Sequence, residues 1–240
     1  MKKMISWLDE FLQVSKFDDV SNNGVQISPR SQKIGTVAFA VDASVKNIRA
    51  ADEVGADLLI VHHGISWGGG IKRITGSMYN VISAAIQSGI GLYASHLPLD
   101  ANKECGNNWE IARALKMTQI KKAFSYHGNV IGVVGKLSQV ERIGEVFPQV
   151  KAEIKGMSGA LKLGVCSGGA GDFAEKAKEL GCDLYLTGEA SWGDIIACEN
   201  SEMKMLCAGH YETEVFGVRA LSKILADRFN VKTVDLTEEK

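Results

Sequence analysis

The sequence predicts an α/β fold made of two related domains with mostly parallel sheets. Short apolar runs of strand length alternate along the chain with longer segments whose apolar residues recur at helical spacing. Residues 54–63 and 180–189 also resemble each other, since each has a Gly-x-Asp stop followed by an apolar run that ends in polar residues. We interpret this echo as two related halves; the alternative is ordinary α/β punctuation that recurs by chance.

The bulk composition is that of an ordinary globular protein. The 240 residues carry a net charge of -1, which gives no global sign of binding to nucleic acid or to an anionic membrane. No apolar run reaches the roughly 18 residues of a membrane span, and no secretory leader is recognisable. Five cysteines without a C-x-x-C pair favour core thiols in a reducing cytoplasm, with Cys105 in a polar stretch as the one candidate reactive thiol. We therefore expect a cytoplasmic protein with no membrane partner.

Periodicity and glycine positions predict the elements of the first half. Residues 4–14 place apolar side chains at helical spacing, and Gly55 and Gly89 suit the positions just after two further helices. Asn107 and Glu110 have the spacing of a capping box, with Asn107 as the N-cap. We predict helices at 4–14, 43–54, 77–88 and 107–117 and strands at 36–41, 56–61 and 90–95.

Beyond residue 125 the apolar runs shorten and glycine becomes more frequent. This change predicts a domain boundary there, with a metal-binding α/β domain at 1–125 plus 208–240 and a second α/β domain at 126–207. The elements predicted after the boundary are strands at 130–136, 161–165, 183–187, 203–208 and 231–236 and helices at 143–150, 172–180, 190–199 and from 210 onward.

The strand at 56–61 runs into two adjacent histidines, His62 and His63, followed by Gly64. Open α/β sheets bind their ligands at the carboxyl ends of the strands. Adjacent residues of a strand point to opposite faces. We therefore expect the chain to leave strand geometry at this pair, with Gly64 permitting the bend, so that both imidazoles reach one site.

More candidate ligands follow other predicted strands. His96 and His210 stand just past two strand ends, and Asp100 and Glu214 follow them at a spacing of four. A lone histidine in such a place is most often structural, but four histidines and two carboxylates at the same ends of strands favour a metal site. Imidazole and carboxylate together suit Zn, Fe, Mn, Ni or Co. The donors are too many for one tetrahedral ion with an open position, which points to two divalent ions.

Two features keep two interpretations each. The glycine-rich stretch 68–70, followed by Lys72 and Arg73, is either a phosphate-binding lid or a plain flexible loop; it lacks the ending of a P-loop. Glu189 takes the place of His63 in the second half of the echo, where it either supports the site or is structural.

Several spaced motifs occur in the order of a known family. They are NGVQ at 23–26, IVHHG at 60–64, SHLPLD at 95–100, TGE at 187–189 and AGHYETE at 208–214. Together they resemble the Nif-three-like family, whose members are often labelled type-two homologues of GTP cyclohydrolase I. The resemblance covers nearly the whole chain, although the larger middle insertion of some relatives is missing.

The resemblance implies the Nif-three-like fold, a dinuclear metal centre and a ring-shaped homohexamer, or toroid. Carried over position by position, it implies these metal ligands: His62, His63, Asp100, His210 and Glu214. His63 and Asp100 would serve one ion, His62 and His210 the other, and Glu214 would bridge the two.

The function expected from this site is a metal-dependent hydrolase of a small substrate such as a purine nucleotide. His96 would act as the catalytic acid or base, since an imidazole titrates near neutral pH. The family label suggests a GTP cyclohydrolase-like reaction, but no pattern here reads guanine. Two alternatives are a ring that carries metal without turnover and a hexameric ring that binds nucleic acid. The basic candidates for the latter are Lys72, Arg73, Lys121 and Lys122.

Overall fold

The computed structural model describes residues 1–238, and the chain divides into two compact units. Unit 1 comprises Met1–Leu99 and Gly217–Lys240, and unit 2 comprises Asp100–Phe216. The units divide at 99 and 216, whereas the sequence analysis placed the boundaries near 125 and 208. The first boundary lies earlier because strand β5 (Thr118–Tyr126) pairs with β6 (Asn129–Leu137) and helix α5 (Asn107–Ala114) packs on the same sheet, which draws residues 100–125 into unit 2.

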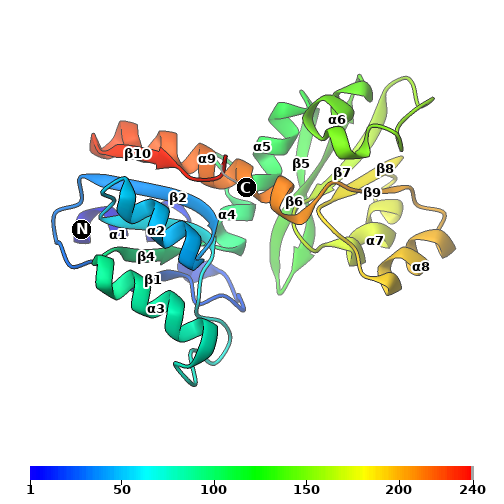
Figure 1. Cartoon of the computed structure of the whole chain (residues 1–240). Helices are drawn as coiled ribbons and strands as arrows, with labels where there is room; N and C mark the ends of the chain where they lie inside the picture. The colour runs from blue at the N-terminus through cyan, green and yellow to red at the C-terminus, as the bar shows by residue number, and fades with distance from the viewer. Residues whose placement is uncertain (239–240) are drawn as a thin grey trace. The chain divides into compact units, whose positions relative to one another are not determined.

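Unit 1 is built on one sheet, which has five strands within the described residues; their order is β1-β4-β3-β2-β10 (Figure 1). Strand β1 pairs antiparallel with β4, and the other neighbours are parallel. The strands are β1 (Gly24–Ile27), β2 (Thr36–Asp42), β3 (Leu58–His63), β4 (Gly91–Ala94) and β10 (Lys232–Asp235). The three central strands β2, β3 and β4 are almost wholly apolar up to their ends, as is usual for strands that are covered on both faces.

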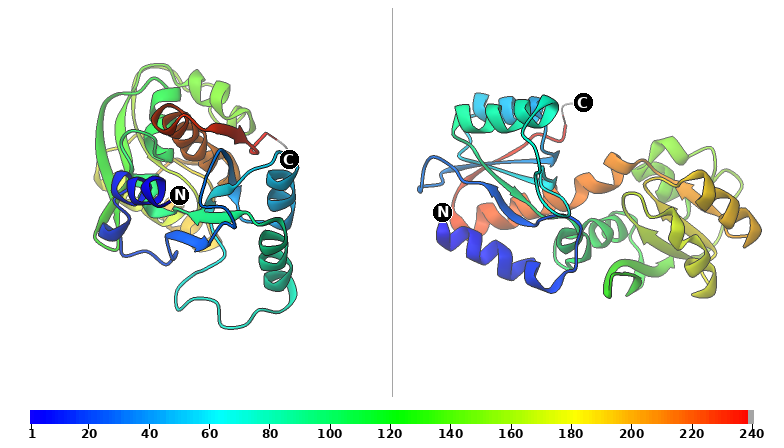
Figure 2. Two further views of the ribbon diagram at one scale, coloured as in Figure 1. Left: turned by 90° about the vertical axis from the view of Figure 1, so that its left-hand side faces the viewer. Right: turned by 90° about the horizontal axis from the view of Figure 1, so that it is seen from below.

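Helices cover both faces of this sheet (Figure 2). Helices α2 (Val45–Glu53) and α3 (Gly76–Ser88) lie on one face, where Ile48 and Ala85 join the core cluster of the strands. Helix α1 (Lys2–Phe11) lies on the other face together with the later part of α9 (His210–Phe229). These helices do not cover the carboxyl ends of β2, β3 and β4, and polar side chains lie at those ends.

Strand β3 continues through both histidines, so the expected departure from strand geometry at that pair was wrong. His63 still pairs in register with Asp42 of the neighbouring strand β2. Gly64 is also not in the left-handed region; a Cβ atom there would lie 2.6 Å from the Cβ of Ala94 and would collide with the amide of Gln26. The glycine is therefore needed for close packing against Gln26 and Ala94, and not for a special backbone angle.

Unit 2 is built on a second five-stranded sheet of the described residues, in the order β5-β6-β7-β8-β9. The first three strands pair antiparallel and the last three pair parallel. The strands are β5 (Thr118–Tyr126), β6 (Asn129–Leu137), β7 (Leu161–Cys166), β8 (Leu184–Thr187) and β9 (Met205–Cys207). The remaining helices are α4 (Leu97–Ala101), α5 (Asn107–Ala114), α6 (Glu141–Val146), α7 (Ala174–Glu179), α8 (Trp192–Asn200) and the single turns η1 (Val14–Lys16), η2 (Pro148–Val150) and η3 (Gly171–Phe173).

The α/β fold class is confirmed, and five of the eight strand pairs within residues 1–238 are parallel. Each unit contains a run of three parallel strands joined by two helices, β2-α2-β3-α3-β4 in unit 1 and β7-α7-β8-α8-β9 in unit 2. These runs contain the two stretches that echo each other in the sequence. The antiparallel strand β5 was not predicted.

Helix α5 does not begin as predicted. Its N-cap is Gly106, and Asn107 is a buried residue inside the first turn. The amide of Asn107 donates a hydrogen bond to Asp100 and so does not cap the helix. Cys105 is also buried, and burial raises the pKa of its thiol far above the ordinary value, so the prediction of a reactive thiol was wrong. Within residues 1–238, no helix is both long and apolar enough to cross a bilayer.

Candidate metal centre

Unit 1 gathers three imidazoles at the carboxyl ends of β3 and β4. His62 and His63 end β3, and His96 follows β4 by two residues. The ring centroid of His62 lies 4.6 Å from that of His63 and 5.0 Å from that of His96. The ring centroids of His63 and His96 are 5.7 Å apart. One ring nitrogen from each lies within 4.8 Å of the others, so these side chains could hold a metal ion.

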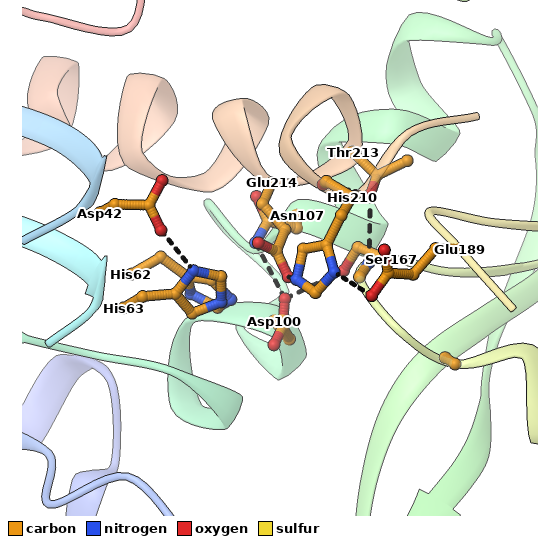
Figure 3. Close-up of polar contacts among 12 residues, drawn as sticks. Asp42, His62, His63, Asp100, Asn107, Ser167, Glu189, His210, Thr213 and Glu214 are labelled. Atoms are coloured by element: carbon orange, nitrogen blue, oxygen red, sulfur yellow. Dashed lines mark hydrogen bonds and ion pairs between the residues drawn. The ribbon is translucent and has the colours of Figure 1, made fainter. Parts of the chain in front are cut away.

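The two rings of the pair are each fixed by a hydrogen bond at Nδ1. Nδ1 of His62 lies 3.0 Å from the carbonyl oxygen of Ser95, and Nδ1 of His63 lies 2.9 Å from Oδ1 of Asp42 (Figure 3). A carbonyl oxygen or an ionised carboxylate only accepts hydrogen bonds, so Nδ1 donates in both rings. The tautomer that results leaves Nε2 as the ligand nitrogen, as in most protein metal sites that contain histidine.

His96 is fixed in the same way by a carboxylate from the N-terminal segment. Its Nδ1 lies 2.9 Å from Oδ1 of Asp19, whose side chain is only 1% exposed. Burial disfavours the charged form of Asp19, but the hydrogen bond and charge of His96, with help from Asn23 and Ser21, hold the pKa of this carboxyl below its ordinary value. Asp19 is therefore a buried carboxylate dedicated to orienting His96.

Side chains of the same N-terminal segment accept hydrogen bonds from the backbone beyond both histidine-bearing strands. Oδ1 of Asn23 accepts a hydrogen bond from the backbone N–H of His96 at 2.7 Å. Oε1 of Gln26 accepts from the backbone N–H groups of Ile65 and Ser66, at 2.6 and 3.1 Å, just after the histidine pair. Asn23 and Gln26 of the NGVQ motif therefore fix the backbone at His96 and the backbone just after the histidine pair. The motif does more than form a turn.

Unit 2 carries the other predicted ligands. Asp100, in α4, is buried, and its Oδ1 accepts hydrogen bonds from Nδ2 of Asn107 at 2.8 Å and from Oγ of Ser167 at 3.0 Å (Figure 3). Glu214, in α9, is also buried. A Cβ atom on Gly168 would lie 2.5 Å from Oε1 of Glu214, and Gly168 has a φ of +68°. The loop at 167–168 thus touches both carboxylates, and only glycine fits at its second residue.

His210 sits at the start of α9 between two carboxylates. Its Nε2 lies 3.2 Å from Oε1 of Glu214, and its Nδ1 lies 2.9 Å from Oε1 of Glu189. The hydrogen bond to Glu214 is the main reason that the pKa of His210 is raised to about 9; burial acts in the opposite direction, and Glu189 adds to the increase. Glu189, whose role the sequence left open, therefore orients His210 as Asp42 orients His63.

The structure places every predicted site residue at a strand end or in the helix that follows it. It brings His62, His63 and His96 together in unit 1, and it places Asp100, His210 and Glu214 around one loop and one helix start in unit 2. The assignment of these residues to particular ions stays a prediction.

Sequence reasoning missed the residues that support the ligands: Asp19, Asp42, Asn107 and Ser167. Asp42 carried a usable signal, because it ends a strand directly beside β3. Asp19 carried none, because it lies in a loop and 77 residues before its partner.

The mixed donor set fits a first-row divalent ion. Imidazole nitrogens and carboxylate oxygens suit Zn, Fe, Mn, Ni or Co better than Mg or Ca. Each of the four histidines donates or can donate its Nδ1 proton to a carbonyl or carboxylate, which is the usual support of a metal-binding histidine.

Comparisons with known proteins give one consistent result. The family model described as Duf34/NIF3 (NGG1p interacting factor 3) matches residues 1–240. A Pyrococcus horikoshii protein named GTP cyclohydrolase 1 type 2 homolog is 39% identical, over 97% of this chain and 95% of its own length. A Deinococcus radiodurans protein of the same name is 40% identical, over 95% of this chain and 89% of its own length.

Solved structures agree with the sequence relatives. A protein described as ybgI, of unknown function, superposes with a TM-score of 0.86 at 26% identity, covering 98% of this chain and 96% of its own. TTHA1606 from Thermus thermophilus superposes with a TM-score of 0.81 at 30% identity, over the same shares of both chains. The similarity therefore extends over both units of the chain.

Proposed function

The chain belongs to the Duf34/NIF3 family, and from this premise we propose that it is a metal-dependent hydrolase with a dinuclear centre. Its substrate is a small molecule, and nucleotides are the first class to test, since the relatives in Pyrococcus horikoshii and Deinococcus radiodurans carry the name GTP cyclohydrolase 1 type 2 homolog. The observation that carries the proposal is the set of Nδ1 hydrogen bonds to carbonyl and carboxylate oxygens, because it orients histidines as metal ligands.

In this proposal His63 and Asp100 would hold one ion, His62 and His210 would hold the other, and Glu214 would serve as a ligand of both. Asn107 and Ser167 support Asp100, since both donate hydrogen bonds to its Oδ1. The proton on His210, which the raised pKa favours near neutral pH, has to leave before this ring can act as a ligand.

The catalytic step follows from the acid–base chemistry of the chain's own side chains. Two divalent ions, when bound, supply Lewis acidity and lower the pKa of water toward neutrality. His96 accepts a proton at Nε2 and later donates it again from the same atom. Nδ1 does not take part, because its own proton is donated to Asp19. Asp19 holds this ring in the tautomer and orientation that the proton transfer needs, as a buried carboxylate does in other Asp–His pairs. The ring of Trp67, whose centroid lies 5.2 Å from that of His96 in a T-shaped arrangement, covers one side of this imidazole.

The first test is metal analysis of protein purified without a chelator or a histidine tag. We expect close to two ions per chain, and His62→Ala and His63→Ala should each empty a different position. An activity screen with nucleotides and phosphate esters then uses the metal that was found. Active protein that contains no metal would refute the proposal, as would either variant that keeps both ions.

The rival function is a ring that carries metal without turnover, and it has the same ligands. The discriminating variant is His96→Gln, because in the dinuclear centre His96 is not a ligand. A hydrolase loses turnover in this variant while its metal content stays near two per chain. A metal carrier has no turnover to lose in the wild type, so absence of hydrolysis across the screen at full metal loading favours the carrier.

We also propose that the chain assembles into a homohexameric ring. Several large apolar side chains are strongly exposed in the single chain, including Trp192 at 75% and Ile86 at 61%. Apolar exposure of this kind is common at subunit interfaces. Sedimentation should give a mass of about 155 kDa, six times the 25.9 kDa of one chain. A monomer or dimer at micromolar concentration would refute the hexamer and leave the metal centre as a separate question.

A further inference from the structure

Unit 1 by itself gathers three imidazoles that could hold one metal ion. His62 and His63 end β3, His96 follows the adjacent parallel strand β4 by two residues, and one nitrogen of each ring lies within 4.8 Å of the others. The ring planes are tilted against each other by 46° to 51°, so the rings are not stacked. Three imidazoles that converge without stacking have the arrangement of a three-histidine metal site, which keeps a fourth position open.

Each ring also has its own acceptor at Nδ1. The acceptors are the Ser95 carbonyl at 3.0 Å, the Asp42 carboxylate at 2.9 Å and the Asp19 carboxylate at 2.9 Å. The same tautomer is therefore fixed in all three, and Nε2 is the nitrogen that each ring offers to an ion. Nε2 of His96 is therefore oriented by a hydrogen bond at Nδ1, as Nε2 of His62 and Nε2 of His63 are.

The surroundings of His96 are rigid. The Asp19 carboxylate accepts from the backbone N–H of Leu97 at 3.0 Å and from Nδ2 of Asn23 at 2.8 Å, in addition to His96. The backbone of His96 is fixed in turn by Asn23. This preorganisation lowers the entropic cost of gathering the ligands. Two carboxylates behind the three neutral rings, Asp19 and Asp42, also partly compensate the charge of a dication.

We propose that unit 1 alone binds one first-row divalent ion through Nε2 of His62, His63 and His96. This goes beyond the proposed function, in which His62 and His63 serve different ions and His96 serves neither. The three-imidazole site captures an ion without any donor from unit 2. His96 is released for its acid–base role once the carboxylates and His210 take part in the dinuclear centre.

The test uses the full chain with the unit 2 donors removed. The variant Asp100→Asn/His210→Ala/Glu214→Gln keeps the volume of both buried carboxyl side chains, and it is titrated with Co²⁺, whose visible absorption reports its coordination. We expect one Co²⁺ per chain, with the absorption of a four- or five-coordinate ion. Zn²⁺ should displace it, because both ions accept the same imidazole geometry.

Further substitutions on this background identify the third ligand. His96→Ala should weaken Co²⁺ binding by more than about 100-fold, which exceeds the roughly 10–100-fold expected when Asp42→Ala removes only the carboxylate that supports His63. The matched control is His127→Ala, since His127 lies in the turn between β5 and β6 and stacks on Tyr126. This control should leave the Co²⁺ affinity unchanged.

Two outcomes overturn the inference. One is a background variant that folds, by circular dichroism and cooperative unfolding, but binds no Co²⁺. The other is binding that survives both His96→Ala and the milder His96→Gln. If the triple variant does not fold, Asp100→Asn/His210→Asn/Glu214→Gln, which still removes all three donors of unit 2, provides the same comparison with a smaller change of volume at position 210. The dinuclear hydrolase is tested separately by two ions and turnover in the wild type, so the two ideas fail on different measurements.

Discussion

Substitution of Asp19 by asparagine should strongly destabilise metal-free unit 1. The carboxylate accepts hydrogen bonds from Ser21 N–H and His96 Nδ1 on one oxygen, and from Asn23 Nδ2 and Leu97 N–H on the other. Asparagine keeps one acceptor oxygen and replaces the second with an amide group that only donates. Two of these donors therefore face another donor, in a place where the side chain is 1% exposed and water cannot replace the lost acceptor.

The magnitude follows from these two lost contacts. A hydrogen bond to a charged group contributes about 1.5–3 kcal/mol, so the loss of two should cost about 3–6 kcal/mol in the free energy of unfolding. The assay is equilibrium urea unfolding of the metal-free protein at pH 7. The control is Asp18→Asn, which removes the same charge from the exposed neighbouring residue and should change the free energy by less than about 0.5 kcal/mol.

The pH dependence of the free energy of unfolding gives a second, independent check of the role of Asp19. The pKa of Asp19 is lowered in the folded protein, so its contribution is present above the unfolded pKa of about 3.9 and is lost as the pH falls through the folded value. The difference between wild type and Asp19→Asn should therefore narrow below about pH 4. A cost of less than about 1 kcal/mol at pH 7, or a difference that widens in acid, would refute the idea that this carboxylate anchors the segment.

Two further predictions concern a glycine and a thiol. Gly168→Ala should lower the metal content of the protein, because the new Cβ would press on Glu214. The control is Gly181→Ala, which has a similar φ of +71° but only Lys162 nearby and should leave the metal content unchanged. Equal metal loss in both variants would contradict the close-contact argument. Both should lose about 1–2 kcal/mol of stability through the left-handed backbone, measured by urea unfolding. Iodoacetamide should label exposed Cys207 and spare buried Cys105 in the native protein, as mass spectrometry of the digests will test, and early labelling of Cys105 would contradict its burial.

The fold was largely predictable because its signals are local. Apolar runs of strand length, helical periodicity and closing glycines located most of the helices and strands, and Gly89 does end α3 with a φ of +78°. The errors fell where tertiary contacts override local preference. Asn107 has the sequence of an N-cap, but its amide is used by buried Asp100, and β5 carries exposed lysines that hid a strand formed by pairing with β6.

The candidate ligands were also predictable from sequence, because position at a strand end and residue chemistry are both visible there. His62 and His63 could be singled out without any coordinates, and the order of motifs pointed to the family.

Only the tertiary structure revealed the residues that orient the ligands. Asp19 meets His96 across 77 residues, and no spacing rule connects such a pair. Asp42 ends a predicted strand and could be noticed there, but only the packing shows that His63 is its partner. The physical reason is that a hydrogen bond depends on a distance of about 3 Å and on direction, and both are fixed by how strands and loops pack together. The sequence alone determined which side chains could bind metal, and the packing decided which nitrogen of each ring would face it.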